Sequence, residues 1–191
     1  FFPVERLSAP RIDGPEEEFE TALNNLDLIL EKHGDELAAV IIEPMVQAAG
    51  GMRMHSAKFL KTLADKIQER GILLITDEVM TGFGRTGKMF AVEHAQVTPD
   101  IMCVAKGLTG GILPLSATLA TDSIYEAFLD EDVRRAFLHG HSFTANPIAC
   151  AAALASLQIF KEEPVFERIA QIEGVYRERF DGLSKYPQVQ S

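Results

Sequence analysis

The chain has 191 residues, of which 47% are hydrophobic and 24% charged, close to the averages of globular proteins. This composition excludes intrinsic disorder, collagen and coiled coil, and the length suits one domain or slightly more. Acidic residues outnumber basic ones by 28 to 18, and the net charge of −10 disfavours nucleic acid as a partner. No apolar run reaches the roughly 18 residues of a membrane span, so no membrane partner is predicted. Two cysteines, Cys103 and Cys150, are too few for a disulfide framework and suit free thiols in a reducing cytoplasm.

Hydrophobic periodicity and turn residues divide the chain into helices and strands. Residues 1–15 carry three prolines and no periodicity, which predicts a loop. The elements predicted after it are a helix between Pro15 and Gly34, a strand over 37–42, a helix between Ser56 and Gly71, strands over 72–75, 101–105 and 115–121, and helices over 122–129, 147–160 and 165–183. Continuously apolar strands that alternate with helices predict an α/β fold with a parallel sheet covered on both faces.

Three charged residues, Glu43, Asp77 and Lys106, each follow a predicted strand. Because parallel strands with right-handed crossovers end at one edge of a sheet, we expect all three to face the crevice where such sheets bind ligands. A lysine in a low-dielectric crevice loses proton affinity and suits a Schiff base with an aldehyde. A nearby carboxylate can keep a pyridine nitrogen protonated, so Asp77 and Lys106 together indicate pyridoxal phosphate (PLP). A structural salt bridge would leave the same sequence pattern.

Two other kinds of site are weakly indicated. Residues 82–88 read Gly-Phe-Gly-Arg-Thr-Gly-Lys, close to a phosphate-binding nucleotide loop, but Met89 stands where a hydroxyl should reach magnesium. The acidic strand also runs directly into this loop, which leaves no strand–loop–helix unit for the phosphates. His139 and His141 have a spacing that could serve a metal, but no cysteine or further histidine supports them, so no metal site is predicted.

Four stretches of the sequence resemble the class III PLP-dependent aminotransferases. They are Ile41–Gln47, Asp77–Gly87, Pro99-Asp100 with Lys106-Gly107, and His139–Pro147. The resemblance runs from about residue 37 to 160 and implies the type I PLP-dependent transferase fold, with a mostly parallel sheet flanked by helices. It implies that residues 1–160 are part of the large PLP-binding domain and that 161–191 form a helix leading towards a small C-terminal domain. With the Phe-Phe-Pro start, it also implies a piece of a longer enzyme with both ends cut.

The resemblance assigns roles at the matching positions. Lys106 is the implied catalytic residue, which carries PLP and moves the proton between substrate and cofactor. Asp77 is expected to pair with the pyridine nitrogen, and Val79 to pack on the ring. Ser142, with His141 beside it, matches a position that binds the phosphate of the cofactor in the neighbouring subunit of a homodimer.

The remaining positions concern the substrate and the back of the site. Arg85 and Gly140 match substrate-binding positions, although a purely structural role in the loop is the alternative for Arg85. Glu43 matches an acidic residue behind the site. Around residue 140 the sequence departs from the family pattern, with His141 for proline, Ser142 for threonine and Ala145 for glycine. Serine keeps the hydroxyl group that phosphate binding needs.

Within the family, residues 46–52, 106–111 and 115–118 look most like enzymes that aminate 8-amino-7-oxononanoate to 7,8-diaminononanoate in biotin biosynthesis, with S-adenosylmethionine as the implied donor. Met80, where many members have glutamine, favours the same branch. The sequence His-Gly-His-Ser at 139–142 looks more like relatives that use lysine as donor, so the donor stays open. Another ω-amino-acid aminotransferase is the second alternative, and a non-catalytic scaffold that retains the fold is the third.

Overall fold

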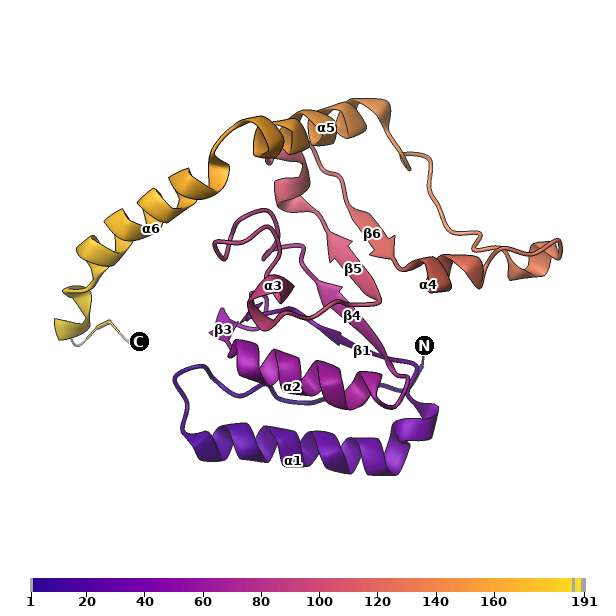
Figure 1. The fold of residues 1–191 in the computed structure, drawn as a ribbon, viewed down its shortest axis with the longest axis horizontal. Helices are drawn as coiled ribbons and strands as arrows, with labels where there is room; N and C mark the ends of the chain where they lie inside the picture. The colour runs from indigo at the N-terminus through magenta and orange to yellow at the C-terminus, as the bar shows by residue number, and fades with distance from the viewer. Residues whose placement is uncertain (1, 187, 190–191) are drawn as a thin grey trace.

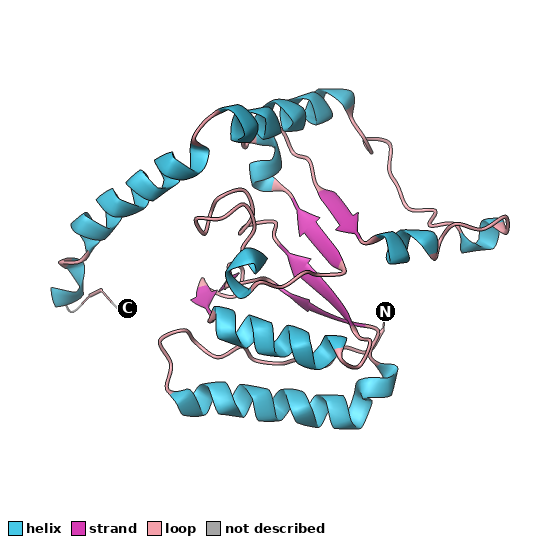
Figure 2. Ribbon diagram, in the orientation of Figure 1, coloured by secondary structure: helices cyan, strands magenta, loops and turns pink. Residues whose placement is uncertain are grey.

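The computed structural model describes residues 2–186 and 188–189, so Phe1 of the predicted opening loop and residues 187, 190 and 191 of the predicted C-terminal segment lie outside the described residues. The helices are α1 (Glu16–His33), α2 (Ala57–Gln68), α3 (Val92–Ala95), α4 (Asp122–Glu126), α5 (Pro147–Glu162) and α6 (Val165–Phe180) (Figure 1). The strands are β1 (Ala39–Ile42), β2 (Val46–Gln47), β3 (Arg53–Met54), β4 (Leu73–Asp77), β5 (Ile101–Val104) and β6 (Ala117–Ala120) (Figure 2). Short 3-10 helices are η1 (Gly34–Glu36), η2 (Lys106–Thr109), η3 (Val133–Arg135) and η4 (Leu183–Lys185).

The long helices begin where capping chemistry predicts. The Oγ of Ser56 accepts a hydrogen bond from the N–H of Phe59 at 3.1 Å and so caps α2. Asn146 caps α5 in the same way, and Pro147 occupies the first turn, where its missing N–H costs nothing. Three glutamates in the first turn of α1 complement the helix dipole. The predictions for α1, α2, α5 and α6 are therefore confirmed, whereas α4 is shorter than its predicted range and ends at Glu126.

The main sheet has the strand order β1-β4-β5-β6. Strands β1, β4 and β5 are parallel, as predicted, but β6 runs antiparallel to β5. The parallel sheet predicted from the alternation of strands and helices does not extend to β6, because only η2 and a loop join β6 to β5. A return to the sheet without a crossover helix reverses the strand direction. The mostly parallel sheet expected from the family resemblance is confirmed.

One face of the sheet carries the helical layer. Figure 1 shows α2 close to the sheet, with α1 outside it and α3 at its end. Both parallel crossovers step in the same direction along the sheet, and right-handed crossovers then place their helices on the same side. On the opposite face the side chain of Ile41 is 66% exposed. The prediction that the sheet is covered on both faces is therefore wrong for the described residues.

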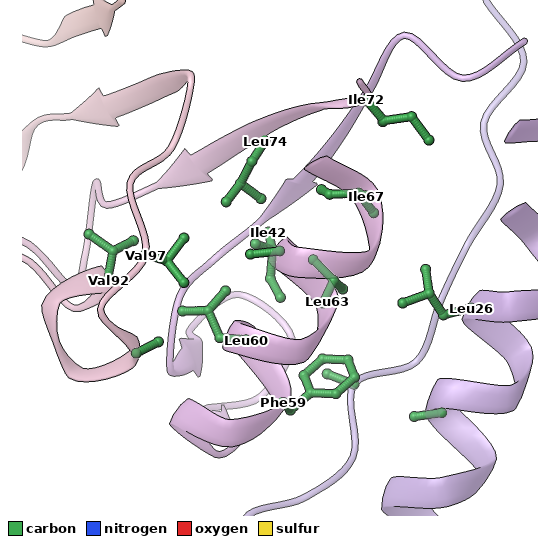
Figure 3. Close-up of a cluster of buried hydrophobic side chains, with 14 of the residues drawn as sticks. Leu26, Ile42, Phe59, Leu60, Leu63, Ile67, Ile72, Leu74, Val92 and Val97 are labelled. Atoms are coloured by element: carbon green, nitrogen blue, oxygen red, sulfur yellow. The ribbon is translucent and has the colours of Figure 1, made fainter. Parts of the chain in front are cut away.

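The hydrophobic core lies between this helical layer and the sheet. It is built from Leu26 of α1, Phe59, Leu60 and Leu63 of α2, and Leu74 of β4, all of which are at most 3% exposed (Figure 3). The apolar positions of α2 recur every three or four residues, which turns all of them towards the sheet. A second, smaller cluster of Val104, Leu108 and Ala153 joins β5, η2 and α5.

Replacing Leu60 tests the energetic weight of this core. Leu60 is fully buried, so we expect Leu60→Ala to lower the free energy of unfolding by about 2–5 kcal/mol, because it removes apolar contacts and leaves a cavity. Urea unfolding of the full-length protein, followed by circular dichroism, measures this loss. Leu28 of α1 is 62% exposed, and Leu28→Ala should change stability by less than about 0.5 kcal/mol. Equal losses in the two variants would contradict the assignment of the core.

Several features escape prediction from local pattern. The two-residue strands β2 and β3 pair as a small hairpin after β1, and α3 is a single helical turn that is too short to be recognised from hydrophobic periodicity. Both cysteines are free, and each is partly buried. The division after residue 160 falls in the last turn of α5, and its placement as a domain boundary stays a prediction.

Candidate active site

A cavity of about 1250 Å³ opens beyond the C-terminal ends of β4 and β5. Four segments form its wall: the loop that follows β4, the turn η2 with the residues around it, residues 141–146, and one side of α5. The wall combines apolar and aromatic side chains with two cations, Lys106 and Arg85. Its position is the one where open α/β sheets bind ligands. A concave, mainly apolar wall with few charged groups is typical of small-molecule sites.

Lys106 lies on this wall at the first position of η2. Its backbone is left-handed, with φ of +39°, which costs a residue with a side chain on the order of 1–3 kcal/mol. The surrounding structure holds this conformation: Thr109 Oγ1 donates to the carbonyl of Leu113, and Ser156 Oγ of α5 donates to the carbonyl of Gly107 at 3.4 Å. No acidic group pairs with the Lys106 amine within the described part of the chain. The amine is therefore available to a ligand.

Asp77 is the last residue of β4 and lies beside Cys103 of β5 in the sheet register. Alternation along β4 turns Asp77 to the face opposite Leu74, away from the helical layer. Its Oδ1 accepts a hydrogen bond from the N–H of Val79 at 3.0 Å, which fixes the carboxyl group, while Oδ2 has no hydrogen-bond partner among residues 2–186 and 188–189. The sequence also allowed a salt bridge between Asp77 and Lys106, and the described residues form none.

The structure gathers only part of the predicted site around the cavity. Val79, Arg85, Lys106 and His141 line it. Asp77, Gly140 and Ser142 are not among its lining residues. Alignment of strand ends alone did not predict this difference, because Asp77 ends its strand whereas Lys106 begins a turn that leads away from the sheet.

The sequence predicts that Glu43 faces the crevice together with Lys106, but the structure places its side chain elsewhere. Its Oε2 accepts a hydrogen bond from the N–H of Ala48 at 2.9 Å, so the side chain closes the segment that leads from β1 into the β2–β3 hairpin. The backbone carbonyl of Glu43 is also bonded to the ring of His55, at 3.0 Å from Nε2. His55 is itself buried, with 1% of its surface exposed. The carboxyl group of Glu43 is therefore bonded within its own loop, whereas the position of Glu43 after a strand predicted that it would face the crevice.

Residues 140–146 form an exposed turn before α5. His141 and Ser142 are both exposed. The Nδ1 of His141 accepts from the N–H of Phe143 at 3.1 Å, and the Oγ1 of Thr144 accepts from the N–H of His141 at 3.0 Å. The turn is thus ordered by its own hydrogen bonds and presents Ser142 outward. No group of three or more potential metal ligands occurs in the described ranges, and none of the helices described there is long and apolar enough to cross a membrane.

Sequence reasoning missed two residues that shape the wall beside Lys106. Phe83 lines the cavity and packs on Gly107, where an added Cβ would lie 2.7 Å from the Cβ of Phe83. Real structures do not allow so short a distance, so Gly107 is required by the approach of Phe83. The apolar side chain between Gly82 and Gly84 was the signal that could have indicated this contact. The glycines instead resemble a phosphate-binding pattern.

The sequence as a whole matches the family model for aminotransferase class III over residues 3–191. The chain belongs to the class III aminotransferases. A protein of Anoxybacillus flavithermus named adenosylmethionine-8-amino-7-oxononanoate aminotransferase is 52% identical over 151 residues, which cover 78% of this chain and 33% of that protein. A protein of the same name from Synechococcus elongatus is 52% identical over 155 residues, covering 81% of this chain and 36% of its own length. The chain thus spans about a third of the length of these relatives.

Solved structures agree with this membership. The structure of adenosylmethionine-8-amino-7-oxononanoate aminotransferase from Methanocaldococcus jannaschii superimposes with a TM-score of 0.85 at 39% identity, covering 93% of this chain and 42% of the other. An amine transaminase from an uncultivated Pseudomonas species, solved in a PLP-bound form, gives a TM-score of 0.84 at 35% identity, covering 94% of this chain and 42% of the other. These matches confirm the aminotransferase fold expected from the sequence.

The residues present fit PLP, the cofactor of this class. The cavity is large enough for a pyridine ring with its substrate, and Lys106 offers an unpaired amine to an aldehyde. Asp77 lies two residues before Val79 and outside the lining residues, and it has one carboxyl oxygen fixed and one available as the hydrogen-bond acceptor that a ring N–H requires. The apolar Val79 on the cavity wall suits contact with a ring face.

Proposed function

We propose that this chain is the cofactor-binding part of an aminotransferase that transfers an amino group from S-adenosylmethionine to 8-amino-7-oxononanoate in biotin biosynthesis. The observation that carries the proposal is 52% identity to relatives of that name across a segment that places Lys106 on the cavity wall. The product would be 7,8-diaminononanoate. Because the chain spans about a third of these relatives, other parts of the protein supply the rest of the substrate contacts.

The cofactor in this proposal is PLP, held by Lys106, Asp77 and Val79. When bound, PLP supplies an electron sink that stabilises negative charge on the substrate carbon. Asp77 holds a proton at the ring nitrogen through its available oxygen. Lys106 moves a proton at its ε-amine, acting as base towards the donor and as acid towards the acceptor. Arg85 lies on the same wall and would contact a polar end of the substrate, with a structural role in its loop as the alternative.

The amino donor distinguishes the close alternatives. Eight relatives between 42% and 52% identical carry the S-adenosylmethionine name, which disfavours a lysine-dependent version of the reaction. The full-length protein, incubated with 8-amino-7-oxononanoate and either donor, should form diaminononanoate with S-adenosylmethionine, as detected by mass spectrometry. Product with lysine alone would establish the lysine-dependent enzyme instead. Turnover of other ω-amino acids only would indicate a different class III aminotransferase, and failure to retain PLP on gel filtration would indicate a scaffold.

We also propose an oligomeric state, a cellular location and a domain organisation for the protein. The outward position of Ser142, with His141 and Gly140 beside it, supports a homodimer in which Ser142 binds the phosphate of the cofactor in the neighbouring subunit. Free cysteines support a cytoplasmic location. Residues 1–160 would belong to the large domain, and 161–191 would lead towards a small domain. If the full-length protein is monomeric, or if a Ser142→Ala variant binds PLP as tightly as the parent, the assignment of Ser142 fails.

A further inference from the structure

The residue after Asp77 is a buried acid that the proposed chemistry does not use. Glu78 is 0% exposed. Its Oε1 accepts a hydrogen bond from the N–H of Val92 at 2.9 Å, and its Oε2 accepts from the hydroxyl of Thr81, which is also fully buried. A buried carboxyl group is costly unless it is hydrogen-bonded, so both contacts are needed for it to remain inside. Glu78 therefore joins two points that lie 14 residues apart in the sequence, at the base of one loop.

That loop connects β4 to α3 and carries part of the cavity wall. Two backbone hydrogen bonds hold the two sides of the loop together. The N–H of Phe83 donates to the carbonyl of Met89 at 2.6 Å, and the N–H of Gly84 donates to the carbonyl of Lys88 at 3.1 Å. At the base, the N–H of Glu78 donates to the carbonyl of Cys103 in β5 at 2.9 Å. The loop is thus tied to the strand that leads to Lys106.

Phe83 is the residue through which this loop contacts the turn that begins with Lys106. Its ring lies against Gly107, with ring carbons 3.0 and 3.1 Å from the place of an added Cβ. The Phe90 ring packs on it edge-on at a centroid distance of 5.7 Å, and the Phe160 ring of α5 lies at 6.3 Å. Phe83 is itself left-handed, with φ of +59°, directly beside the left-handed Lys106 turn. Two strained backbone positions therefore meet at one contact.

We propose that Glu78 and Phe83 are positioning residues for Lys106: the buried carboxyl group of Glu78 closes the loop 79–91, and the closed loop holds Phe83 against Gly107, which keeps Lys106 in its left-handed conformation on the cavity wall. The role of Lys106 in this inference rests on the proposed function. The mechanical coupling from Glu78 to η2 does not, because it can be measured without cofactor or substrate.

The first test compares three variants of the full-length protein. Glu78→Ala removes both hydrogen bonds, whereas Glu78→Gln retains an acceptor for Val92 and a group that can bond the Thr81 hydroxyl. Lys88→Ala changes an exposed side chain of the same loop and serves as the matched control. Misplacement of a catalytic group by about 1 Å costs on the order of 10²-fold in rate, so Glu78→Ala should lower kcat by about that factor. Glu78→Gln and Lys88→Ala should retain most activity.

Two further readouts separate positioning from general stability. In cofactor-free protein, amide hydrogen exchange at 79–91 and at 106–110 should accelerate together in Glu78→Ala, and it should accelerate in neither Glu78→Gln nor Lys88→Ala. In the PLP-loaded protein, the pH titration of the visible absorbance should shift in Glu78→Ala, because it reports the surroundings of the Lys106 nitrogen. Faster exchange at 79–91 alone, or a loss of thermal stability with unchanged titration and unchanged kcat, would overturn the proposal. If the parent protein transaminates nothing, the proposed function fails while the exchange experiment still decides the coupling.

A second test examines the contact between Phe83 and Gly107 directly. Gly107→Ala places a methyl group against the Cβ of Phe83 and should displace η2, with a loss of activity. Phe83→Gly removes that Cβ and suits the left-handed backbone at position 83. Because Phe83→Gly also removes the side chain that holds η2, it should by itself lower activity and exchange protection at 106–110, and the double variant should lose no more than Phe83→Gly alone. Losses that multiply independently would show that the two residues do not act through one contact.

Discussion

Lys106→Ala is expected to abolish transamination by the full-length enzyme, with kcat at least ~10³-fold lower than in the parent. The proposed function gives the Lys106 amine two roles, to hold the cofactor covalently and to move the substrate proton, and this variant would remove both. Alanine keeps a Cβ, so the left-handed backbone at position 106 stays as strained as before, and the variant isolates the loss of the amine. Steady-state turnover and the visible absorbance of bound PLP measure the two functions separately.

Lys88→Ala is the matched control for this experiment. Lys88 is exposed, donates only to the backbone carbonyl of Glu93 and lines no part of the cavity, so its loss should leave turnover close to that of the parent. A Lys106→Ala protein that keeps both the parent absorbance and the parent turnover would refute the assignment of the catalytic lysine. Lost absorbance with unchanged thermal stability would show that the loss is chemical and not a failure to fold.

The sequence predicted the elements of this fold well where one local rule governs each of them. Ser56 caps α2 because its hydroxyl meets a free N–H, and the apolar spacing of Phe59, Leu60 and Leu63 turns one face to the sheet. Strand direction depends on what connects two strands, and apolar runs do not encode it. The antiparallel β6 was missed for this reason.

The site was predictable in its chemistry and less so in its geometry. The types of Asp77 and Lys106 already indicated PLP, but side-chain contacts made after folding decide which residues reach the cavity. Glu43 was expected there and is instead held by the N–H of Ala48. Phe83 was not expected there, because its contact with Gly107 joins segments 24 residues apart and no local pattern reports it. Long-range contacts of this kind become visible only in the folded chain.

The proposed role of Asp77 also depends on a contact that the sequence alone does not show. Its Oδ1 is bonded to the N–H of Val79, so pairing with the pyridine nitrogen would use Oδ2. Asp77→Asn is nearly isosteric and keeps an oxygen that can accept from the N–H of Val79, so the local turn after β4 should survive. It removes the negative charge that would hold a proton at the ring nitrogen. The amide should therefore weaken the electron sink without unfolding the strand, and the defect should appear in kcat more than in KM.

We expect Asp77→Asn to lower kcat by on the order of 10²-fold, the size of effect that removal of one preorganised electrostatic group has in other enzymes. Asp100→Asn provides the matched control: Asp100 also accepts from a backbone N–H, that of Leu74 at 2.8 Å, and the amide oxygen can replace it. Turnover and the pH dependence of the bound-cofactor absorbance, measured on both full-length variants, should change only for Asp77→Asn. Equal behaviour of the two variants would mean that Asp77, like Asp100, serves only the sheet, and the PLP-binding role assigned to it would be wrong.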